Sequence, residues 1–150
     1  PAGHQTKKKE FINRPSSKLY VQMFFSRGVV KKIYQSAFYN KSKVTEDMID
    51  ACYNRLRTQG CLSSLFELAK AVNPEEIEKY FKKISLIKQP TLIIWGRDDT
   101  WIPADFAEFF HREIPGSTLE IIPECGHVPQ EEHPGKVAGL IYDFAVKGNK

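Results

Sequence analysis

The spacing of apolar residues divides the chain into a first part with helical periodicity and a second part with short, strand-like runs. Up to about residue 83, apolar residues recur at intervals of three and four, which places them on one face of a helix. The spacing of apolar residues changes at Ile84–Pro90, and after it β-branched and aromatic residues lie in two short runs. The pattern therefore predicts a helical module followed by an α/β part.

Five helices are expected in the first part. Thr45 has the side chain to cap the third of them, which begins with acidic residues and ends with arginines, the order that the helix dipole favours. Pro74 suits the first turn of the fifth, a short charged helix. The five ranges are 16–25, 30–38, 46–57, 62–72 and 75–83.

The second part predicts two strands joined by a helix. Thr91–Trp95 and Ser117–Ile122 are the strand-like runs, and each is broken by a turn that contains glycine. Pro103 opens the connecting helix, and Pro134 opens a last helix with one apolar face. Because a strand–helix–strand unit makes its two strands parallel, both turns are expected to leave the sheet at the same edge.

Each of these turns carries a residue that can move or orient a proton. Asp99 follows the first strand, and His127 follows the second, 28 positions later (127 − 99). An aspartate beside a histidine is two-thirds of a Ser-His-Asp relay, in which the acid fixes the tautomer and the histidine transfers the proton. Taken singly, Asp99 could close a turn or cap the next helix, and His127 could be a surface histidine.

Three phrases around these turns resemble the C-terminal part of the α/β-hydrolase family. They are Trp95-Gly-Arg-Asp-Asp99, Trp101-Ile-Pro103, and Glu124-Cys-Gly-His-Val-Pro-Gln-Glu-Glu-His-Pro134. These motifs are most similar to those of the lid-bearing branch of the family, which includes carbon–carbon bond hydrolases, esterases and epoxide or haloalkane hydrolases.

The resemblance implies an α/β fold made of the last two parallel strands with flanking helices, preceded by a helical lid. Residues 1–83 would be the lid, and residues 84–150 would carry Asp99 as the triad acid and His127 as the general base. Trp101, Ile102 and Val128 would contact a small, largely apolar ester or carbon–carbon substrate. In the carbon–carbon branch the residue after the histidine is typically aromatic, and Val128 departs from that pattern.

The family's nucleophile is missing from this sequence. It sits in Gly-x-Ser-x-Gly before the acid, and none of the nine serines lies in that frame. The resemblance therefore implies a hydrolase fragment, which needs the missing N-terminal half or another copy of the chain as a partner to its exposed strand edge. The alternative is a non-catalytic ligand-binding or interaction module on a hydrolase scaffold.

The amino-acid composition and charge argue against several other classes of function. A chain of 150 residues with 41% hydrophobic residues can form a core, and its net charge of +4 is mild. The basic clusters mix with acids and lack an aromatic stacking array, so we expect no nucleic-acid partner. Because the sequence shows neither a membrane span nor a signal peptide, we expect no membrane association and a cytoplasmic location.

Histidine and cysteine spacing indicates no metal and no cofactor, because neither His-Glu-x-x-His nor Cys-x-x-Cys occurs. Three cysteines without a pairing pattern argue against a disulfide scaffold. We expect Cys125 to be a semi-buried thiol, His111 to lie on the surface of a helix, and His133 to be structural.

Overall fold

A computed structural model describes residues 25–71 and 73–147, which form two compact units. We call residues 25–32, 45–71 and 73–78 the helical unit, and residues 33–44 and 79–147 the α/β unit. The sequence pattern places the division at residue 84, whereas residues 33–44 and 79–83 belong to the α/β unit. The assignment of residues 1–83 as a lid stays a prediction.

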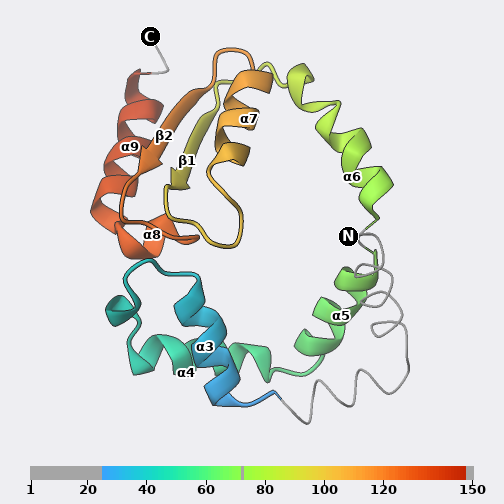
Figure 1. The fold of residues 1–150 in the computed structure, drawn as a ribbon, viewed down its shortest axis with the longest axis vertical. Coiled ribbons are helices and arrows are strands. Elements are labelled where there is room, and N and C mark those ends of the chain that lie inside the picture. The colour runs from blue at the N-terminus through green and yellow to red at the C-terminus, as the bar shows by residue number, and fades with distance from the viewer. Residues whose placement is uncertain (1–24, 72, 148–150) are drawn as a thin grey trace. The chain divides into compact units, whose positions relative to one another are not determined.

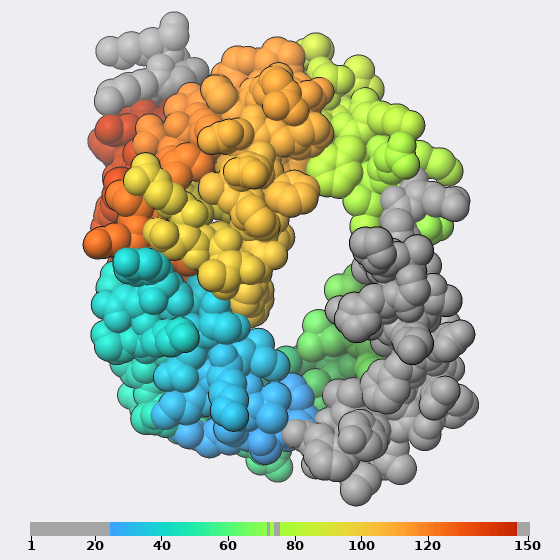
Figure 2. Space-filling view, in the orientation of Figure 1, coloured from blue at the N-terminus to red at the C-terminus, as the bar shows by residue number. Residues whose placement is uncertain are grey.

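The α/β unit contains the predicted pair of parallel strands. β1 (Leu92–Gly96) pairs with β2 (Thr118–Ile122) in a register that runs from Leu92 opposite Thr118 to Gly96 opposite Ile122. In the described part of the chain β1 has no strand on its other edge. Yellow atoms of β1 and the loop after it are visible on the face of the molecule drawn in Figure 2.

Both faces of this sheet are covered, by α7 (Asp105–Glu113) on one side and α9 (Pro134–Lys147) on the other (Figure 1). Because side chains alternate along a strand, each strand contributes to two separate clusters. Ile93 and Trp95 pack with Ala107 of α7, while Ile94 packs with Val137 of α9. Burial on both faces explains why apolar residues dominate both strands, with Thr118 and Glu120 of β2 as the polar exceptions.

The regular elements of the helical unit are all helices, as the periodicity predicts for residues 25–71. They are the start of α3 (Arg27–Ser36), then α4 (Glu46–Leu56), α5 (Cys61–Ala71) and most of α6 (Pro74–Phe81). Thr45 caps α4 as predicted, because its hydroxyl accepts a hydrogen bond from the Met48 N–H (3.2 Å). The helix expected over residues 16–25 lies almost wholly outside the described residues.

The predicted helix over residues 30–38 ends two residues early, at Ser36. Ala37 and Phe38 are nevertheless buried, at 3% exposure each. The Ala37 carbonyl accepts a hydrogen bond from the His127 N–H (2.7 Å), so the backbone leaves the helix to pair with a distant turn. This tertiary contact overrides the local periodicity. Three short helices were not predicted: η1 (Lys41–Lys43), η2 (Ile84–Leu86) and α8 (Pro129–Glu132).

Candidate active site

The turn after β1 is fixed to the turn after β2 by reciprocal hydrogen bonds. The Asp98 N–H donates to the Cys125 carbonyl (2.9 Å), and the Asp98 carboxylate accepts from the Glu124 N–H (2.9 Å). Glu124 adopts a left-handed backbone (φ 53°), which is uncommon for a residue other than glycine. Asp98 is exposed, as predicted for the turn residue. Its side chain also holds Glu124 in this conformation.

Asp99 is buried, and its carboxylate accepts three hydrogen bonds. Oδ1 accepts from the N–H groups of Trp101 (2.8 Å) and Ile102 (3.0 Å), and Oδ2 lies 2.8 Å from His127 Nδ1. Burial opposes ionisation, but the hydrogen bonds from Ile102, His127 and Trp101 outweigh it and hold the pKa of Asp99 below its ordinary value. Asp99 is therefore a carboxylate at neutral pH.

His127 lies in the turn after β2, with its ring held on one nitrogen and one face. Because an ionised carboxylate can only accept, the proton between the two side chains is assigned to Nδ1 of His127. The Trp101 ring packs on the imidazole with centroids 4.8 Å apart, and its indole N–H donates to Ser36 Oγ (3.1 Å). Within residues 25–71 and 73–147, Nε2 has no hydrogen-bond partner.

The prediction that Asp99 and His127 meet at one edge of the sheet is confirmed by this geometry. The acid side chain is 3% exposed and the histidine side chain 31%, so the carboxylate is shielded while the imidazole is accessible. A carboxylate on Nδ1 leaves Nε2 free to accept a proton and stabilises the resulting imidazolium. The pair can therefore act as an oriented general base.

Two glycines allow the turns to stack backbone against backbone. A Cβ on Gly96 would lie 2.0 Å from the Gly126 carbonyl oxygen, and a Cβ on Gly126 would lie 2.3 Å from the Ala37 carbonyl oxygen. Both distances are far inside van der Waals contact, so no other residue fits at either position without a backbone shift. The glycine before His127 is therefore required by packing.

The residue that sequence reasoning missed is Glu132 at the end of α8. It is 3% exposed, and its carboxylate accepts from the N–H groups of Gly126 (2.5 Å), Tyr39 (3.0 Å) and Asn40 (3.0 Å). The last two donors are 93 and 92 positions away in the sequence. Glu132 lies five residues after His127 among other polar residues, and nothing in this local sequence indicates that its side chain is buried. The sequence therefore does not distinguish Glu132 from its exposed neighbour Glu131.

A recess of about 210 Å³ adjoins the pair and is lined by both Asp99 and His127. Of the residues predicted to contact substrate, Trp101 packs on His127, and Ile102 uses its backbone to bind Asp99 and the Trp95 indole. Trp101, Ile102 and Val128 do not line this recess, and their contact with substrate stays a prediction. Its other lining residues are Ile94, Trp95, Gly96, Pro129, Gln130 and Val137.

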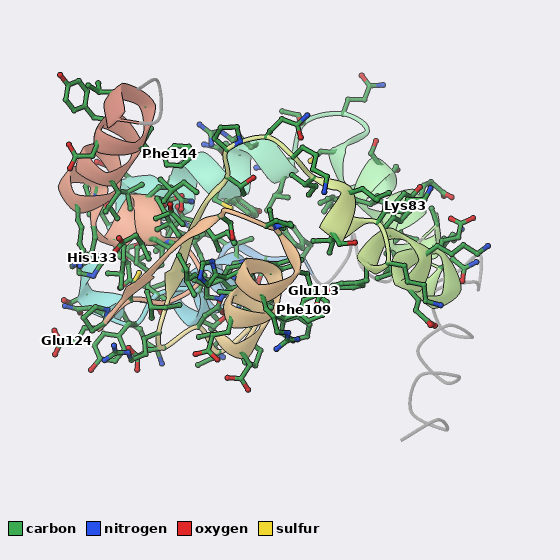
Figure 3. The ribbon with its side chains drawn as sticks, turned by 90° about the horizontal axis from the view of Figure 1, so that it is seen from above. Lys83, Phe109, Glu113, Glu124, His133 and Phe144 are labelled. Atoms are coloured by element: carbon green, nitrogen blue, oxygen red, sulfur yellow. The ribbon has the colours of Figure 1, made fainter. Side chains whose placement is uncertain are left out.

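His111, His133 and Cys125 have structural contacts. His133 Nε2 lies 3.0 Å from the Glu124 carbonyl oxygen, and both residues are labelled in Figure 3. His111 is exposed on α7, as predicted, and its Nδ1 lies 2.9 Å from Ser117 Oγ. Cys125 is fully buried, and burial together with the nearby Glu132 charge raises the pKa of its thiol to about 11.

Residues 25–71 and 73–147 bring together no cluster of three or more histidine, cysteine, aspartate or glutamate side chains with the geometry of a metal site. The helices in the same ranges are too short or too polar to cross a membrane. The cytoplasmic location expected from the sequence stays a prediction.

Comparison with known families identifies the scaffold that carries this pair. The model of a family described as the alpha/beta hydrolase fold matches residues 5–134. The chain belongs to the α/β hydrolase family. The two-stranded parallel sheet with flanking helices is the C-terminal part of that fold, which confirms the fold class expected from the sequence.

Relatives in the α/β hydrolase family are longer than this chain. A 2-hydroxy-6-oxononadienedioate/2-hydroxy-6-oxononatrienedioate hydrolase of Cupriavidus pinatubonensis (strain JMP 134 / LMG 1197) is 30% identical over 115 residues, which are 77% of this chain and 40% of that protein. The crystal structure of CarC, a serine hydrolase involved in carbazole degradation, matches with a TM-score of 0.67 at 25% identity, over 81% of this chain and 48% of CarC.

A second structure supports the fold alone. Cfl2 from Burkholderia cenocepacia matches with a TM-score of 0.72 at 20% identity, over 93% of this chain and 47% of Cfl2. The chain therefore spans less than half the length of each of these three proteins.

Proposed function

We propose that this chain supplies the acid and the general base of a Ser-His-Asp hydrolase. The observation that carries the proposal is the 2.8 Å contact between His127 Nδ1 and Asp99 Oδ2, formed on adjoining turns of an α/β hydrolase. Asp99 holds the imidazole in one tautomer and stabilises its protonated form. His127 takes the proton from the nucleophile and returns it to the leaving group.

In this proposal the nucleophile comes from outside the 150 residues. No serine of the sequence lies in Gly-x-Ser-x-Gly, the strand–turn–helix motif that exposes the hydroxyl in this family. The nucleophile and the oxyanion donors are then supplied by the N-terminal half of the hydrolase. The sixty per cent of the Cupriavidus relative that the chain does not match leaves room for such a half.

The substrate we propose is a small, largely apolar ester or carbon–carbon compound, held beneath a lid formed by residues 1–83. A closed lid excludes water from the reacting groups. Trp101 and Ile102 support an apolar site, because they lie two and three residues after Asp99 and are exposed by 47% and 39%. The relative from Cupriavidus is named for a dienedioate, a dicarboxylate, so that compound is the second substrate to test.

The partner we propose is the N-terminal half, or a second copy of the chain, seated on the edge of β1 that no strand within residues 25–71 and 73–147 covers. An apolar strand with unpaired backbone groups is a template for pairing, and two strands form a thin sheet. Light scattering on the isolated 150-residue chain tests this point, and we expect self-association. A soluble monomer with a cooperative melt would contradict it.

The catalytic proposal is tested by substituting His127 in the complete protein. His127→Ala should lower kcat by a factor on the order of 10⁴ or more, because the members of a triad act as a unit. The substrates are an aryl ester of a short apolar acid and a 2-hydroxy-6-oxo-dienedioate, both followed by absorbance. His111→Ala is the matched control, since His111 is exposed on α7, and it should retain wild-type turnover. Wild-type rates in His127→Ala would overturn the proposal.

The second candidate is a non-catalytic ligand-binding or interaction module. The observation that favours it is the absence of a nucleophile motif in the sequence. It predicts binding of the same two compounds without turnover, with an affinity that His127→Ala leaves nearly unchanged. Calorimetry and the kinetic assay on the same preparation separate the two candidates.

A further inference from the structure

Glu132 joins two segments that are far apart in the sequence. One carboxylate oxygen accepts from Gly126 and Tyr39, and the other accepts from Asn40. Gly126 directly precedes His127, while Tyr39 and Asn40 lie in the segment that follows α3. The carboxylate therefore holds the histidine turn against residues 37–40.

Further contacts run between the same two segments. The Lys43 ammonium donates to the Glu132 carbonyl (2.5 Å), and the His127 N–H donates to the Ala37 carbonyl (2.7 Å). The backbone of Gly126 packs so closely on Ala37 and Tyr39 that a Cβ would not fit. Ser36, the last residue of α3, also reaches the acid turn, because its Oγ accepts a hydrogen bond from the Trp101 indole N–H. No contact of this group depends on substrate.

The surroundings of the Glu132 side chain favour a charged carboxylate. Burial opposes the ionisation of Glu132, but the three backbone N–H groups and the Lys43 charge outweigh it and keep the pKa below its ordinary value. All three partners are donors, so only an acceptor-only group satisfies them. A glutamine would present its NH₂ group to at least one N–H, and the turn would have to shift.

We propose that Glu132 is a positioning residue for His127, which it places by fixing the N–H of Gly126 and the segment 37–40 to one carboxylate. The inference rests on the proposed function, since the aim of Nε2 matters only if His127 transfers a proton. It concerns a residue whose carboxylate hydrogen-bonds neither to Asp99 nor to the imidazole. Displacing a catalytic group by about 1 Å can cost on the order of 100-fold in rate, so a small shift of this turn is enough to be measured.

The test compares Glu132→Gln with Glu131→Gln in the complete protein. Glu131 is the matched control, because it is the preceding residue of α8, carries the same charge and is exposed, with its carboxylate accepting from the Tyr34 hydroxyl. Two readouts are needed: steady-state kinetics on the substrates above, and the Nδ1 proton signal of His127 in protein labelled with ¹⁵N-histidine. The signal is assigned by its loss in His127→Ala.

We expect Glu132→Gln to lower kcat by about 10- to 100-fold with little change in KM, and to broaden the Nδ1 proton signal by faster exchange. Glu131→Gln should match the wild type in both readouts. Glu132→Asp keeps the charge but draws the carboxylate back by one methylene, so it should recover part of the lost kcat. A residue that only stabilised the fold would lower the melting temperature and leave kcat of the folded protein unchanged.

Wild-type kcat and a wild-type Nδ1 proton signal in folded Glu132→Gln would overturn the proposal. If Glu132→Gln does not fold, Glu132→Asp decides, and wild-type values for both readouts there would overturn it equally. If the wild-type protein hydrolyses neither substrate, the proposed function fails. The Nδ1 proton signal then still tests the positioning of His127, because it requires no turnover.

Discussion

The two turns that meet at the candidate active site are held in different ways. Asp99 accepts from backbone groups two and three residues ahead of it, so the acid turn is largely built from its own sequence. The histidine turn is held from outside, through the Ala37 carbonyl and the Glu132 carboxylate. The acid is therefore oriented largely by its own turn, whereas the backbone of the histidine turn also depends on residues 37–40, more than eighty positions away.

Of the substitutions that test this difference between the two turns, we expect one in the acid turn to have the largest effect. Asp99→Asn should lower kcat on the order of 10⁴-fold in the complete protein, because the amide favours the wrong imidazole tautomer. Asp98→Asn is the control on the same turn. Its side-chain oxygen can still accept from Glu124, so most activity should remain. Equal losses in both variants, measured with the same substrates, would show that the turn's shape matters and the Asp99 charge does not.

Crowding the histidine turn should have the next largest effect, this time on stability. Gly126→Ala forces a Cβ toward the Ala37 carbonyl, and we expect the free energy of unfolding to fall by about 3 kcal/mol, measured by denaturant unfolding. Gly139→Ala is the control, because its Cβ would meet no atom within 4 Å and alanine is the better helix former within α9. It should stabilise by up to about 1 kcal/mol. If Gly126→Ala is as stable as the wild type, the turn is less tightly held than the contacts indicate.

The local elements of the fold could be predicted from the sequence because their determinants are close together. The apolar runs of β1 and β2, the Thr45 cap and the helix opened by Pro134 each depend on neighbours within a turn or a strand. The meeting of Asp99 and His127 followed from the parallel pairing of two such strands. These features need no knowledge of distant contacts.

Apart from the three short helices, the features that escaped prediction depend on contacts between distant segments. The end of α3 at Ser36 and the role of Glu132 arise when residues 37–44 pack on the histidine turn. Nothing within a helical period of Glu132 distinguishes it from the exposed Glu131. The acid turn could be predicted from the sequence because neighbouring residues hold it. The support of the histidine turn could not be predicted, because it comes from residues far away in the sequence.

Lowering the pH should reduce the contribution of both turns to the free energy of unfolding, by less than Gly126→Ala does. The pKa values of Asp99 and Glu132 are below their ordinary values in the folded protein. Their contribution to stability is therefore fully present above about pH 4 to 5 and is lost as the pH falls toward the folded values. Each carboxylate adds at most about 1.4 kcal/mol per pH unit to the slope. Unfolding free energies measured from pH 5 to 3 should fall less steeply in Glu132→Gln than in Glu131→Gln, and equal slopes would contradict the assignment.

The smallest expected effect is on the reactivity of Cys125, which reports whether the histidine turn opens. Its thiol is fully buried with a pKa of about 11, so at pH 8 roughly one molecule in a thousand carries the reactive thiolate. Cys52 and Cys61 are only partly buried. A thiol reagent should therefore label Cys125 last in the native protein, as peptide mass analysis would show. In Glu132→Gln the nearby negative charge is removed and the turn is loosened, and both changes favour faster labelling. If Cys125 reacts as fast as Cys61 in the wild type, the histidine turn already opens freely, and the contrast with the acid turn is greater than the hydrogen bonds indicate.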